Sequence, residues 1–426
     1  MQLTKRFFYK YFSYLFFFPV LIIIRIIKPF ILVRLDDSYS SRFGHFSGMT
    51  SLYLSKKQNK IDQPKQKFID FFILNKKISN NQLYKIYKKK LNYLPWFFYY
   101  ITDLNRKLPA ATVHSIYFHK NEIQKKINFQ HHDVDHLIDV TPPPINFDKE
   151  DIFIAEKEMS QLGLKKDDKI VMLIVRDSGY LSHEFPNKDW SYKKQDANIE
   201  NFEAAINEAI NRGYKVIRAG IYHKNFLQIK NPNYIDLFKI NKRTSLLELY
   251  LFSICSFCLG TYSGGSVAAN FLFRKPTIIT NQIPLDETRT YSKNNFVIYK
   301  IIYDKIRKKK LNLSENFELA NSKLGQEVLH AAPVEKGYAD NNFFDLYQKK
   351  DFEIIENSSS EILSITEEVI DYLENNFTKI NLYDKKFKNI FLTNLKNYPN
   401  SRHKHGKDIK CKIGHDFLNM YKDLIN

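Results

Sequence analysis

Residues 251–284, LFSICSFCLGTYSGGSVAANFLFRKPTIITNQIP, read as a strand, a loop of small residues, a short helix and a second strand. The apolar run before the loop predicts a buried strand. It gives way to residues 260–266, GTYSGGS, and a helical pattern over residues 267–273 begins there. Pro276 ends the helix because proline lacks an N–H, and residues 277–280 resume as a buried strand.

This loop is a candidate site for an anion, most naturally a phosphate. The first N–H groups of a helix have no partner within the helix and carry partial positive charge. Here the hydroxyls of Thr261, Ser263 and Ser266 join them, beside Gly264 and Gly265. The alternative is a tight turn whose glycines only allow close helix packing, because the loop matches neither the dinucleotide fingerprint nor the Walker P-loop.

The chain of 426 residues is strongly basic, with 65 Lys+Arg against 46 Asp+Glu and a net charge of +19. Its length predicts two domains. The charge favours an anionic partner, which could be nucleic acid, an anionic membrane surface or a phosphorylated substrate. The alternative is that many lysines only solvate the surface.

Three cysteines are too few for a disulfide framework and point to a reducing compartment. Cys255 and Cys258 have the spacing of a redox pair or half a zinc site, but no second half accompanies them. We interpret them as buried core thiols. Near Cys411, His403-Lys-His405 matches no zinc module, so we expect a solvated basic tail over residues 379–426 and no metal site.

The amino-terminal segment, residues 1–28, is predicted to associate with a membrane. Nearly every residue of the stretch 7–24 is aromatic or aliphatic, and basic residues stand on both sides of it. This length is near the lower limit for crossing ~30 Å of hydrocarbon. A helix seated on the membrane with snorkelling cations is at least as good an interpretation as a span.

Strands and helices alternate on both sides of residues 141–144, TPPP, whose prolines exclude regular structure. We therefore expect two α/β domains with a cleft between them. The predicted boundaries are residues 29–140 for the first domain, 141–148 for a linker and 149–378 for the second domain. Expected strands include residues 30–35, 68–74, 112–118, 169–175, 215–218, 234–238 and 352–357.

Two neighbouring strands of the second half end close to an arginine, Arg176 in one case and Arg218 in the other. Ser178 and Gly179 follow the first strand, and Gly220 follows the second. Ligands bind at the carboxyl edge of open α/β sheets, and a guanidinium can hold a diphosphate bidentately. The pattern predicts a pocket for a nucleoside diphosphate; the alternative is an Arg176 paired with Asp177 or with Asp168.

Four motifs occur together in the order and spacing of a known family. They are residues 42–46, RFGHF; residues 175–181, VRDSGYL; residues 216–220, VIRAG; and residues 259–266, LGTYSGGS, followed by Lys275-Pro276. Jointly they resemble a family of bacterial glycosyltransferases found among surface-polysaccharide genes, such as those for lipopolysaccharide or capsule. The resemblance covers roughly residues 29–375.

The resemblance implies a GT-B fold, in which two Rossmann-like domains face a cleft and the second holds a nucleotide-sugar donor. It also implies no metal and no cofactor, since cations and helix dipoles bind the diphosphate. Glu248 stands where the family has Asp, which lengthens an acceptor with a proposed ribose-binding or loop-bracing role. Carried onto this chain, the donor site comprises Arg176, Ser178, Gly179, Arg218, Gly220, Glu248, Thr261, Ser263, Gly264, Gly265 and Ser266.

The acceptor side of such an enzyme belongs to the first half, where the loop after the first strand faces the donor. His45 is the first candidate to deprotonate an acceptor hydroxyl, and Asp36 or Asp37 is the next. A histidine suits this role because its unperturbed pKa, ~6.5, lies near neutral pH. The alternative is that His45 only shapes the turn and caps the following helix.

The resemblance, together with the apolar amino-terminal segment, implies a glycosyltransferase at the cytoplasmic face of the inner membrane. It would move a sugar from a nucleotide sugar to a lipid-linked or cell-surface polysaccharide acceptor, without nucleic acid as a partner. One alternative is a GT-B-fold epimerase or hydrolase acting on the sugar nucleotide itself. Another is a basic nucleic-acid-binding protein, for which residues 84–90, YKIYKKK, interleave aromatic and basic side chains.

Overall fold

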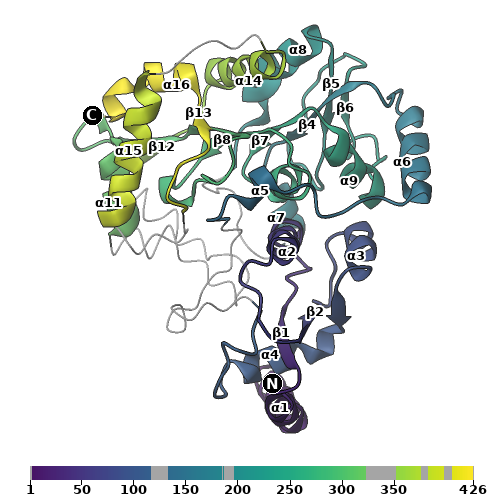
Figure 1. Cartoon of the computed structure of the whole chain (residues 1–426). Helices are drawn as coiled ribbons and strands as arrows, with labels where there is room; N and C mark the ends of the chain where they lie inside the picture. The colour runs from purple at the N-terminus through teal and green to yellow at the C-terminus, as the bar shows by residue number, and fades with distance from the viewer. Residues whose placement is uncertain are drawn as a thin grey trace. The chain divides into compact units, whose positions relative to one another are not determined.

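The computed structural model describes residues 2–116, 133–184, 186, 196–322, 352–375, 382–397 and 405–425. They divide between two compact units, which Figure 1 draws with labelled elements. Unit 1 comprises Met1–His131 and Pro144–Phe147, and unit 2 comprises His132–Pro143 and Asp148–Asn426. Each unit contains a parallel β-sheet with helices packed on it.

Unit 1 is built on a parallel sheet in the order β1-β2-β3. β1 pairs with β2 in a register that sets Leu32 opposite Phe68 and Asp37 opposite Ile73. A single parallel bridge joins Leu35 to Ser115. The described elements are α1 (Gln2–Ile26), β1 (Leu32–Asp37), α2 (Phe43–Gln58), β2 (Phe68–Ile73), α3 (Asn81–Lys88), β3 (Asn92–Leu94), the 3₁₀ turn η1 (Trp96–Phe98) and α4 (Tyr99–Asn105).

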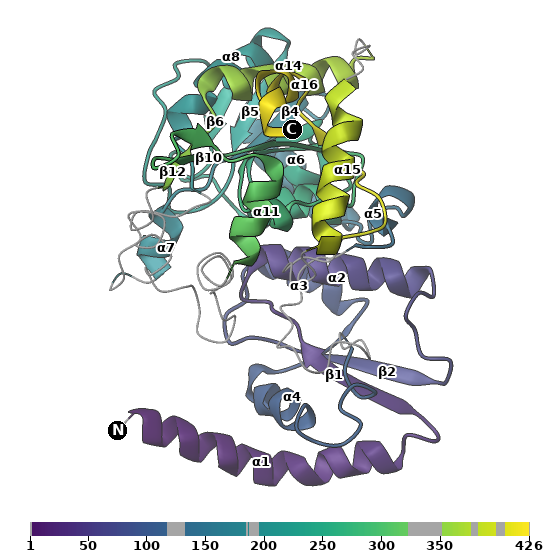
Figure 2. The same cartoon turned by 90° about the vertical axis from the view of Figure 1, so that its left-hand side faces the viewer.

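The amino-terminal helix α1 is part of the core of unit 1. Phe17, Leu21 and Ile24 are buried, and they lie on one face because they recur at helical spacing. They pack with side chains from β1, β2 and α4, including Leu35 and Leu104. Figure 2 shows α1 lengthwise beside α4. Residues 9–26 of this helix are also long and apolar enough to cross a membrane, judged by length and composition alone.

Unit 2 contains seven described strands in one parallel sheet, ordered β13-β9-β8-β7-β4-β5-β6. The chain runs from β4 outward through β5 and β6, then returns to place β7 on the other side of β4. The strands are β4 (Lys169–Ile174), β5 (Tyr214–Arg218), β6 (Tyr234–Asp236), β7 (Phe257–Thr261), β8 (Thr277–Gln282), β9 (Asn295–Tyr299) and β13 (Lys412–Ile413). This reversal between β4 and β7 is the topological switch point of the sheet.

Helices cover both faces of this sheet. α8 and α14 lie over one face, and α6 and α9 lie over the other (Figures 1 and 2). The core is apolar because buried residues of the strands, such as Val171 and Leu259, meet buried residues of α8 and α14. The remaining helical elements of unit 2 are α5 (Leu137–Val140), α6 (Lys149–Gln161), α7 (Gly179–Glu184), η3 (Ile199–Phe202), α8 (Glu203–Asn211), α9 (Ser245–Ile254), α10 (Gly264–Val267), η4 (Ala268–Leu272), η5 (Leu285–Glu287), α11 (Leu313–Asn321), α14 (Ser359–Leu373), α15 (Leu382–Asn397), α16 (His415–Met420) and η7 (Lys422–Ile425).

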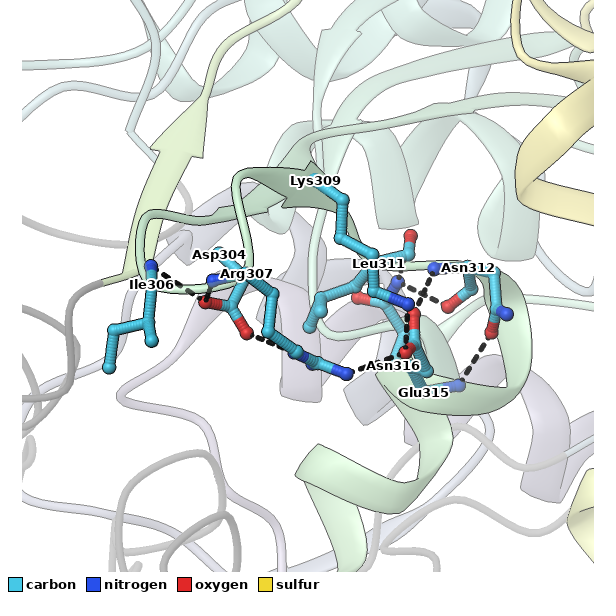
Figure 3. A network of polar contacts seen from close by, with 8 residues as sticks. All are labelled: Asp304, Ile306, Arg307, Lys309, Leu311, Asn312, Glu315 and Asn316. Atoms are coloured by element: carbon cyan, nitrogen blue, oxygen red, sulfur yellow. Dashed lines mark hydrogen bonds and ion pairs between the residues drawn. The ribbon is translucent and has the colours of Figure 1, made fainter.

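A small antiparallel sheet adjoins this core, with the order β11-β10-β12, formed by β10 (Ile301–Asp304), β11 (Lys309–Lys310) and β12 (Phe352–Ile355). Charged groups hold its turn, as Figure 3 shows. Asp304 accepts hydrogen bonds from the Arg307 backbone and guanidinium, and Glu315 accepts from Arg307 and Lys309. Glu315 also closes a capping box with Asn312 at the start of α11.

Two sequence expectations fail in the described residues. Residues 112–116 form turns and one bridge in place of the first part of a strand, and residues 117–118 of that prediction lie outside the described part. The expected solvated tail is wrong over residues 382–397 and 405–425. Phe387 and Phe391 of α15 are buried in the main core, β13 extends the main sheet beside β9, and Cys411 is fully buried. His403 lies outside the described residues, whereas buried His405 contacts Thr290 and the Asp286 carbonyl.

Candidate functional site

The candidate site lies in unit 2 at the carboxyl ends of β4 and β7, where the order of the sheet reverses. The backbone N–H of Arg176, just after β4, donates a hydrogen bond of 2.9 Å to Oγ1 of Thr261, the last residue of β7. Open α/β sheets bind their ligands in the crevice at this kind of switch point. The two loops that the sequence singled out are therefore neighbours, held together by a side chain of one of them.

The loop after β7 leads directly into a helix. Ser263 has extended backbone angles, α10 begins at Gly264, and the helix continues as the π-helix η4. Ser266 Oγ accepts from the Ser263 N–H and donates to the Ser263 carbonyl, both at 2.9 Å. The helix thus begins three residues earlier than its apolar pattern indicates, and its first N–H groups lie at the end of β7. Short π-helical segments frequently mark functional sites.

Ser263 has an orphaned polar atom at this helix start. Its Oγ is buried and faces the Ser266 N–H across the capping box, but it makes no well-formed hydrogen bond among the described residues. A buried hydroxyl without a partner is costly, so such a group normally meets a water or a ligand. The orphaned Oγ indicates a place for a polar ligand atom beside the N–H groups of Gly264 and Gly265.

Gly265 has a packing role of its own. A Cβ at this position would lie 2.9 Å from the side-chain tips of Ile174 and Phe252. The second glycine therefore allows α10 to approach β4 and α9 closely. The alternative interpretation of the glycine pair, close helix packing, holds for Gly265, and it does not conflict with an anion site at the same helix start.

The loop after β4 carries Arg176, Ser178 and Gly179. The Arg176 side chain is about one-quarter exposed, and its Nε lies 3.2 Å from Oδ1 of Asp196. Ser178 is buried, and Gly179 begins α7. A Cβ on Gly179 would lie 1.8 Å from the carbonyl oxygen of Tyr222, so only glycine fits there. Arg176 therefore pairs with Asp196, which lies farther along the chain than the two expected partners, Asp177 and Asp168.

Arg218, at the end of β5, is fully buried. Its Nη1 lies 3.2 Å from Oδ2 of Asp236 and donates to the Asn225 carbonyl at 2.9 Å. Nη2 lies 4.0 Å from Oδ2 of Asp177. The structure thus places Arg218 as an internal cation close to two carboxylates, while its Nε and Nη2 have no hydrogen-bond partner among the described residues. Its contact with a donor stays a prediction.

Glu248 braces the loop after β5. One oxygen accepts from the Gly220 N–H at 2.9 Å, and the other contacts Nη2 of Arg243 at 2.6 Å. Both carboxylate oxygens are therefore engaged within the protein, and Glu248 is nearly buried. Of the two roles considered for this residue, bracing a loop matches its contacts.

A stacked ring pair at the same edge was not singled out by sequence. His183 of α7 and Tyr222 have ring centroids 3.5 Å apart with an interplanar angle of 10°. His223 follows, with Phe226 and Phe238 near its ring. Burial and the nearby Arg218 charge lower the pKa of His223 to about 4, so this imidazole is neutral at physiological pH. The only sign of this ring cluster in the sequence was the pair Tyr222-His223 shortly after Gly220.

A second buried arginine, Arg289, also escaped sequence reasoning. It is 3% exposed, and its Nε donates to the hydroxyl of Tyr262 at 3.0 Å. Tyr262 lies between Thr261 and Ser263, so this guanidinium places positive charge directly beside the candidate anion loop. The only sequence signal was a lone arginine in a polar stretch after β8, which has no motif to distinguish it.

In unit 1, the carboxylates of Asp36 and Asp37 end β1 and are nearly buried. Nη2 of Arg106 lies 2.9 Å from Oδ1 of Asp36 and 3.4 Å from Oδ2 of Asp37. Thr102 donates to Asp37 at 3.1 Å. Burial raises the pKa of Asp37 to about 6. The positive charge of Arg106 lowers this pKa, and the negative charge of Asp36 raises it. Asp37 is thus a carboxylate able to gain or lose a proton near neutral pH.

His45 lies in the first turn of α2 and is half-buried. Its ring centroid is 6.1 Å from that of Tyr39, which follows β1 with a positive φ of 51°. The structure therefore places His45 and the aspartate pair in the same stretch of unit 1, around the loop that follows its first strand.

Other candidate chemistries find less support. Cys255 and Cys258 are buried, as expected, and burial raises the pKa of the Cys255 thiol to about 12. Within the described ranges, no three His, Cys, Asp or Glu side chains gather as a metal site. Tyr87, in the basic aromatic stretch of α3, is fully buried and bonded to the Ser47 carbonyl, so it cannot stack on a base.

No protein-family model and no curated protein matches the chain. Among solved structures, the ADP-heptose LPS heptosyltransferase II of E. coli matches with 12% identity and a TM-score of 0.35, over 63% of this chain and 89% of that one. The family 9 glycosyltransferase of Veillonella parvula DSM 2008 matches with 9% identity and a TM-score of 0.39, over 75% and 96%. The dodecameric iron-containing heptosyltransferase TibC, in complex with ADP-D-β-D-heptose, matches with 11% identity and a TM-score of 0.29, over 60% and 59%. Such low scores establish neither a shared fold nor a shared activity.

Proposed function

We propose that this protein is a glycosyltransferase that moves a sugar from a nucleotide-sugar donor to a lipid-linked or cell-surface polysaccharide acceptor. The observation that carries the proposal is the switch point of the unit 2 sheet, where Thr261 joins the ends of β4 and β7 beside a helix start. Sites of this kind bind nucleotides. The four motifs that resemble surface-polysaccharide glycosyltransferases support the interpretation that this nucleotide is the carrier of a sugar to be transferred.

The donor diphosphate would lie against the loop from Thr261 to Ser266. The N–H groups of Gly264 and Gly265 and the orphaned Ser263 hydroxyl would donate to phosphate oxygens. Arg176 would add a cation at the side of β4, and Arg289 adds buried positive charge behind Tyr262. These groups would stabilise the nucleoside diphosphate as it leaves, which is the task that a metal performs in other enzymes.

In the reaction, an acceptor hydroxyl attacks the anomeric carbon while the bond from that carbon to the diphosphate oxygen breaks. The hydroxyl proton goes to a carboxylate or imidazole of unit 1, and the nucleoside diphosphate leaves with the bonding electrons. We assign the base to Asp37, whose pKa of about 6 suits the role, and keep Asp36 and His45 as the other candidates. This assignment requires the GT-B arrangement, in which the two units face one cleft.

The test is a binding screen with the purified full chain. Diphosphates and diphosphate sugars of uridine, guanosine, thymidine, cytidine and adenosine are compared by thermal shift and calorimetry. Ser263→Ala should lower the free energy of unfolding by about 1 kcal/mol or less, because the Oγ belongs to the capping box at the start of α10. It should weaken the bound nucleotide roughly tenfold or more, as expected for a lost hydrogen bond to a charged group.

Ser253→Ala is the matched control, because Ser253 lies near the end of α9, away from the carboxyl edge of the sheet, and its Oγ donates to the Tyr250 carbonyl of the same helix at 2.6 Å. Its nucleotide affinity should equal that of the wild type. If no nucleotide binds, or if the Ser263 variant binds as tightly as the control, the donor site is misplaced. Consumption of a nucleotide sugar without any acceptor would favour an epimerase or hydrolase. Unchanged transfer after chelation of metals would support the metal-independent form of the proposal.

A further inference from the structure

Over residues 9–26 of α1, most apolar side chains face outward and the two basic side chains contact the protein, which is the opposite of the pattern of a surface helix in water. Of these two basic side chains, Lys10 lies 2.9 Å from Asp103, and Arg25 donates to Asn105 at 2.9 Å. Tyr14 donates to Asp103 as well. The remaining circumference carries exposed apolar side chains, which are Tyr9, Tyr11, Phe12, Leu15, Phe16, Phe18, Val20, Ile22, Ile23 and Ile26. A soluble surface helix shows the opposite pattern.

From this arrangement we propose that α1 lies flat in the interfacial layer of an anionic lipid bilayer and does not cross it. The proposal holds whether or not the protein transfers a sugar, because it depends on unit 1 alone. Ordinary protein surfaces expose apolar residues singly, whereas the exposed apolar residues of α1 are contiguous along one helix. An interfacial helix buries such a face ~5–10 Å into the boundary between headgroups and acyl chains.

The contacts of α1 argue against a span. Phe17, Leu21 and Ile24 belong to the core of unit 1, and polar contacts fasten the helix to α4 and the following turn from Lys10 to Arg25. A helix that crossed the bilayer would have to leave these contacts and empty the core. Otherwise it would pull the Lys10–Asp103 ion pair into hydrocarbon, where a charged group is expensive. Lying flat keeps every one of these contacts.

Neighbouring residues of unit 1 extend the same surface. Trp96 and Phe97 are about half exposed, and a chain of ring contacts leads from Phe97 through Phe98 to Phe17. Lys76 lies 5.8 Å above the Trp96 ring. Tryptophan beside lysine is typical of a membrane interface, where the ring sits at the headgroups and the cation meets lipid phosphate. The net charge of +19 favours an anionic lipid in the same way.

The first experiment is co-sedimentation of the full chain with vesicles of phosphatidylglycerol and phosphatidylethanolamine. Phe16→Ser is compared with Phe153→Ser, because both phenylalanines are 69% exposed and Phe153 lies on α6 of unit 2. The Phe16 ring has an edge contact with the core residue Phe17, at a centroid distance of 5.4 Å. We expect Phe16→Ser to weaken vesicle binding on the order of tenfold. Leu15→Ser combined with Phe16→Ser should weaken it further, and Phe153→Ser should bind as the wild type does.

The second experiment separates a flat helix from a span. Lys5→Cys and Lys305→Cys are made singly, and membranes from expressing cells are labelled with an impermeant maleimide from each side. Lys305 is an exposed residue of the turn between β10 and β11, and the three native cysteines are buried. A flat α1 leaves both new cysteines reactive from the same side. Labelling from opposite sides would overturn the proposal.

Two other results would also overturn it. One is equal vesicle binding by the wild type and the Leu15→Ser/Phe16→Ser variant. The other is a combination of two findings: the wild type binds no vesicles, and it forms a dimer without lipid that the variant cannot form. A second copy of the chain would then cover the apolar face of α1. Stronger binding to anionic than to zwitterionic vesicles, reduced by salt, is expected from the charge.

Discussion

The backbone N–H of Arg176 donates to Thr261 Oγ1 at 2.9 Å, so the residue that ends β7 fixes the start of the loop after β4. This hydrogen bond joins two segments that are 85 residues apart in sequence. It lies where the sheet order reverses, and its loss should therefore alter both loops of the candidate site together.

Thr261→Val removes this acceptor while keeping the shape of the side chain. We expect it to lower the free energy of unfolding by about 1 kcal/mol, because one partly buried N–H loses its partner. Nucleotide affinity should fall as well, while Thr261→Ser, which keeps the hydroxyl, should retain most of it. Thermal melts and calorimetry on the three proteins measure both effects. Equal affinity of the valine and serine variants would show that the hydrogen bond does not position the loops.

Gly265→Ala should destabilise unit 2, because the new Cβ would lie 2.9 Å from Ile174 and Phe252 side-chain atoms. Overpacking of this kind costs roughly 1–3 kcal/mol. Adding Ile174→Val shortens one of the clashing side chains, so the double variant should be more stable than the sum of the single effects predicts. Denaturant midpoints of the four proteins give this coupling. Simple additivity would mean that the helix start moves away from β4 and removes the clash itself.

Arg218→Met tests whether this buried cation is structural. Removing it leaves Asp236 buried without its charge partner, which costs roughly 3–5 kcal/mol. Asp236→Asn in the same chain should restore much of that loss, because the uncompensated charge is then gone. Urea unfolding of the single and double variants measures the rescue. If Arg218→Met is as stable as the wild type but fails to bind nucleotide, Arg218 contacts the ligand and does not serve the fold.

The sequence predicts the candidate loop well because its signal is local. Small polar residues between an apolar strand and a short helix allow few structures, and α10 does begin within the predicted loop. The strands before and after it follow from continuous apolar runs, which are typical of a parallel sheet covered on both faces. Arg176 and Thr261 could likewise be placed at strand ends by counting along those runs.

Contacts between distant segments were beyond such reasoning. Arg218 and Arg176 look equivalent in sequence, since each stands near a strand end, but Asp236 and Asp177 enclose only the former. Arg289 approaches Tyr262 through a polar stretch after β8 that has no periodicity. The burial of Cys411 depends on a two-residue strand, β13, pairing with β9, and so short a strand leaves no alternating pattern to read.

The raised pKa of Asp37 predicts how transfer depends on pH. Burial holds this pKa at about 6, so the carboxylate is ionised at neutral pH and accepts protons only below that range. If Asp37 is the base, transfer to acceptor should rise with pH through about 6 and level off above it. Asp37→Asn should abolish transfer at every pH while donor binding persists. A profile whose rise survives in this variant would assign the base to another group, with His45→Gln as the next variant to measure.

The same pKa predicts the pH dependence of stability, and its direction is opposite to that of an ordinary paired carboxylate. The folded pKa of Asp37, about 6, lies above the ordinary aspartate value of 3.8, so the folded protein binds the proton more tightly than the unfolded chain does. Ionised Asp37 therefore destabilises the fold above pH 6, and this penalty is relieved as the pH falls toward 4. Asp37→Asn removes the charge, so its midpoint of unfolding relative to the wild type should increase between pH 5 and pH 8. Urea unfolding across that range measures the difference, and a difference that shrinks with rising pH would mean that Arg106 stabilises the ionised carboxylate more strongly than burial opposes it.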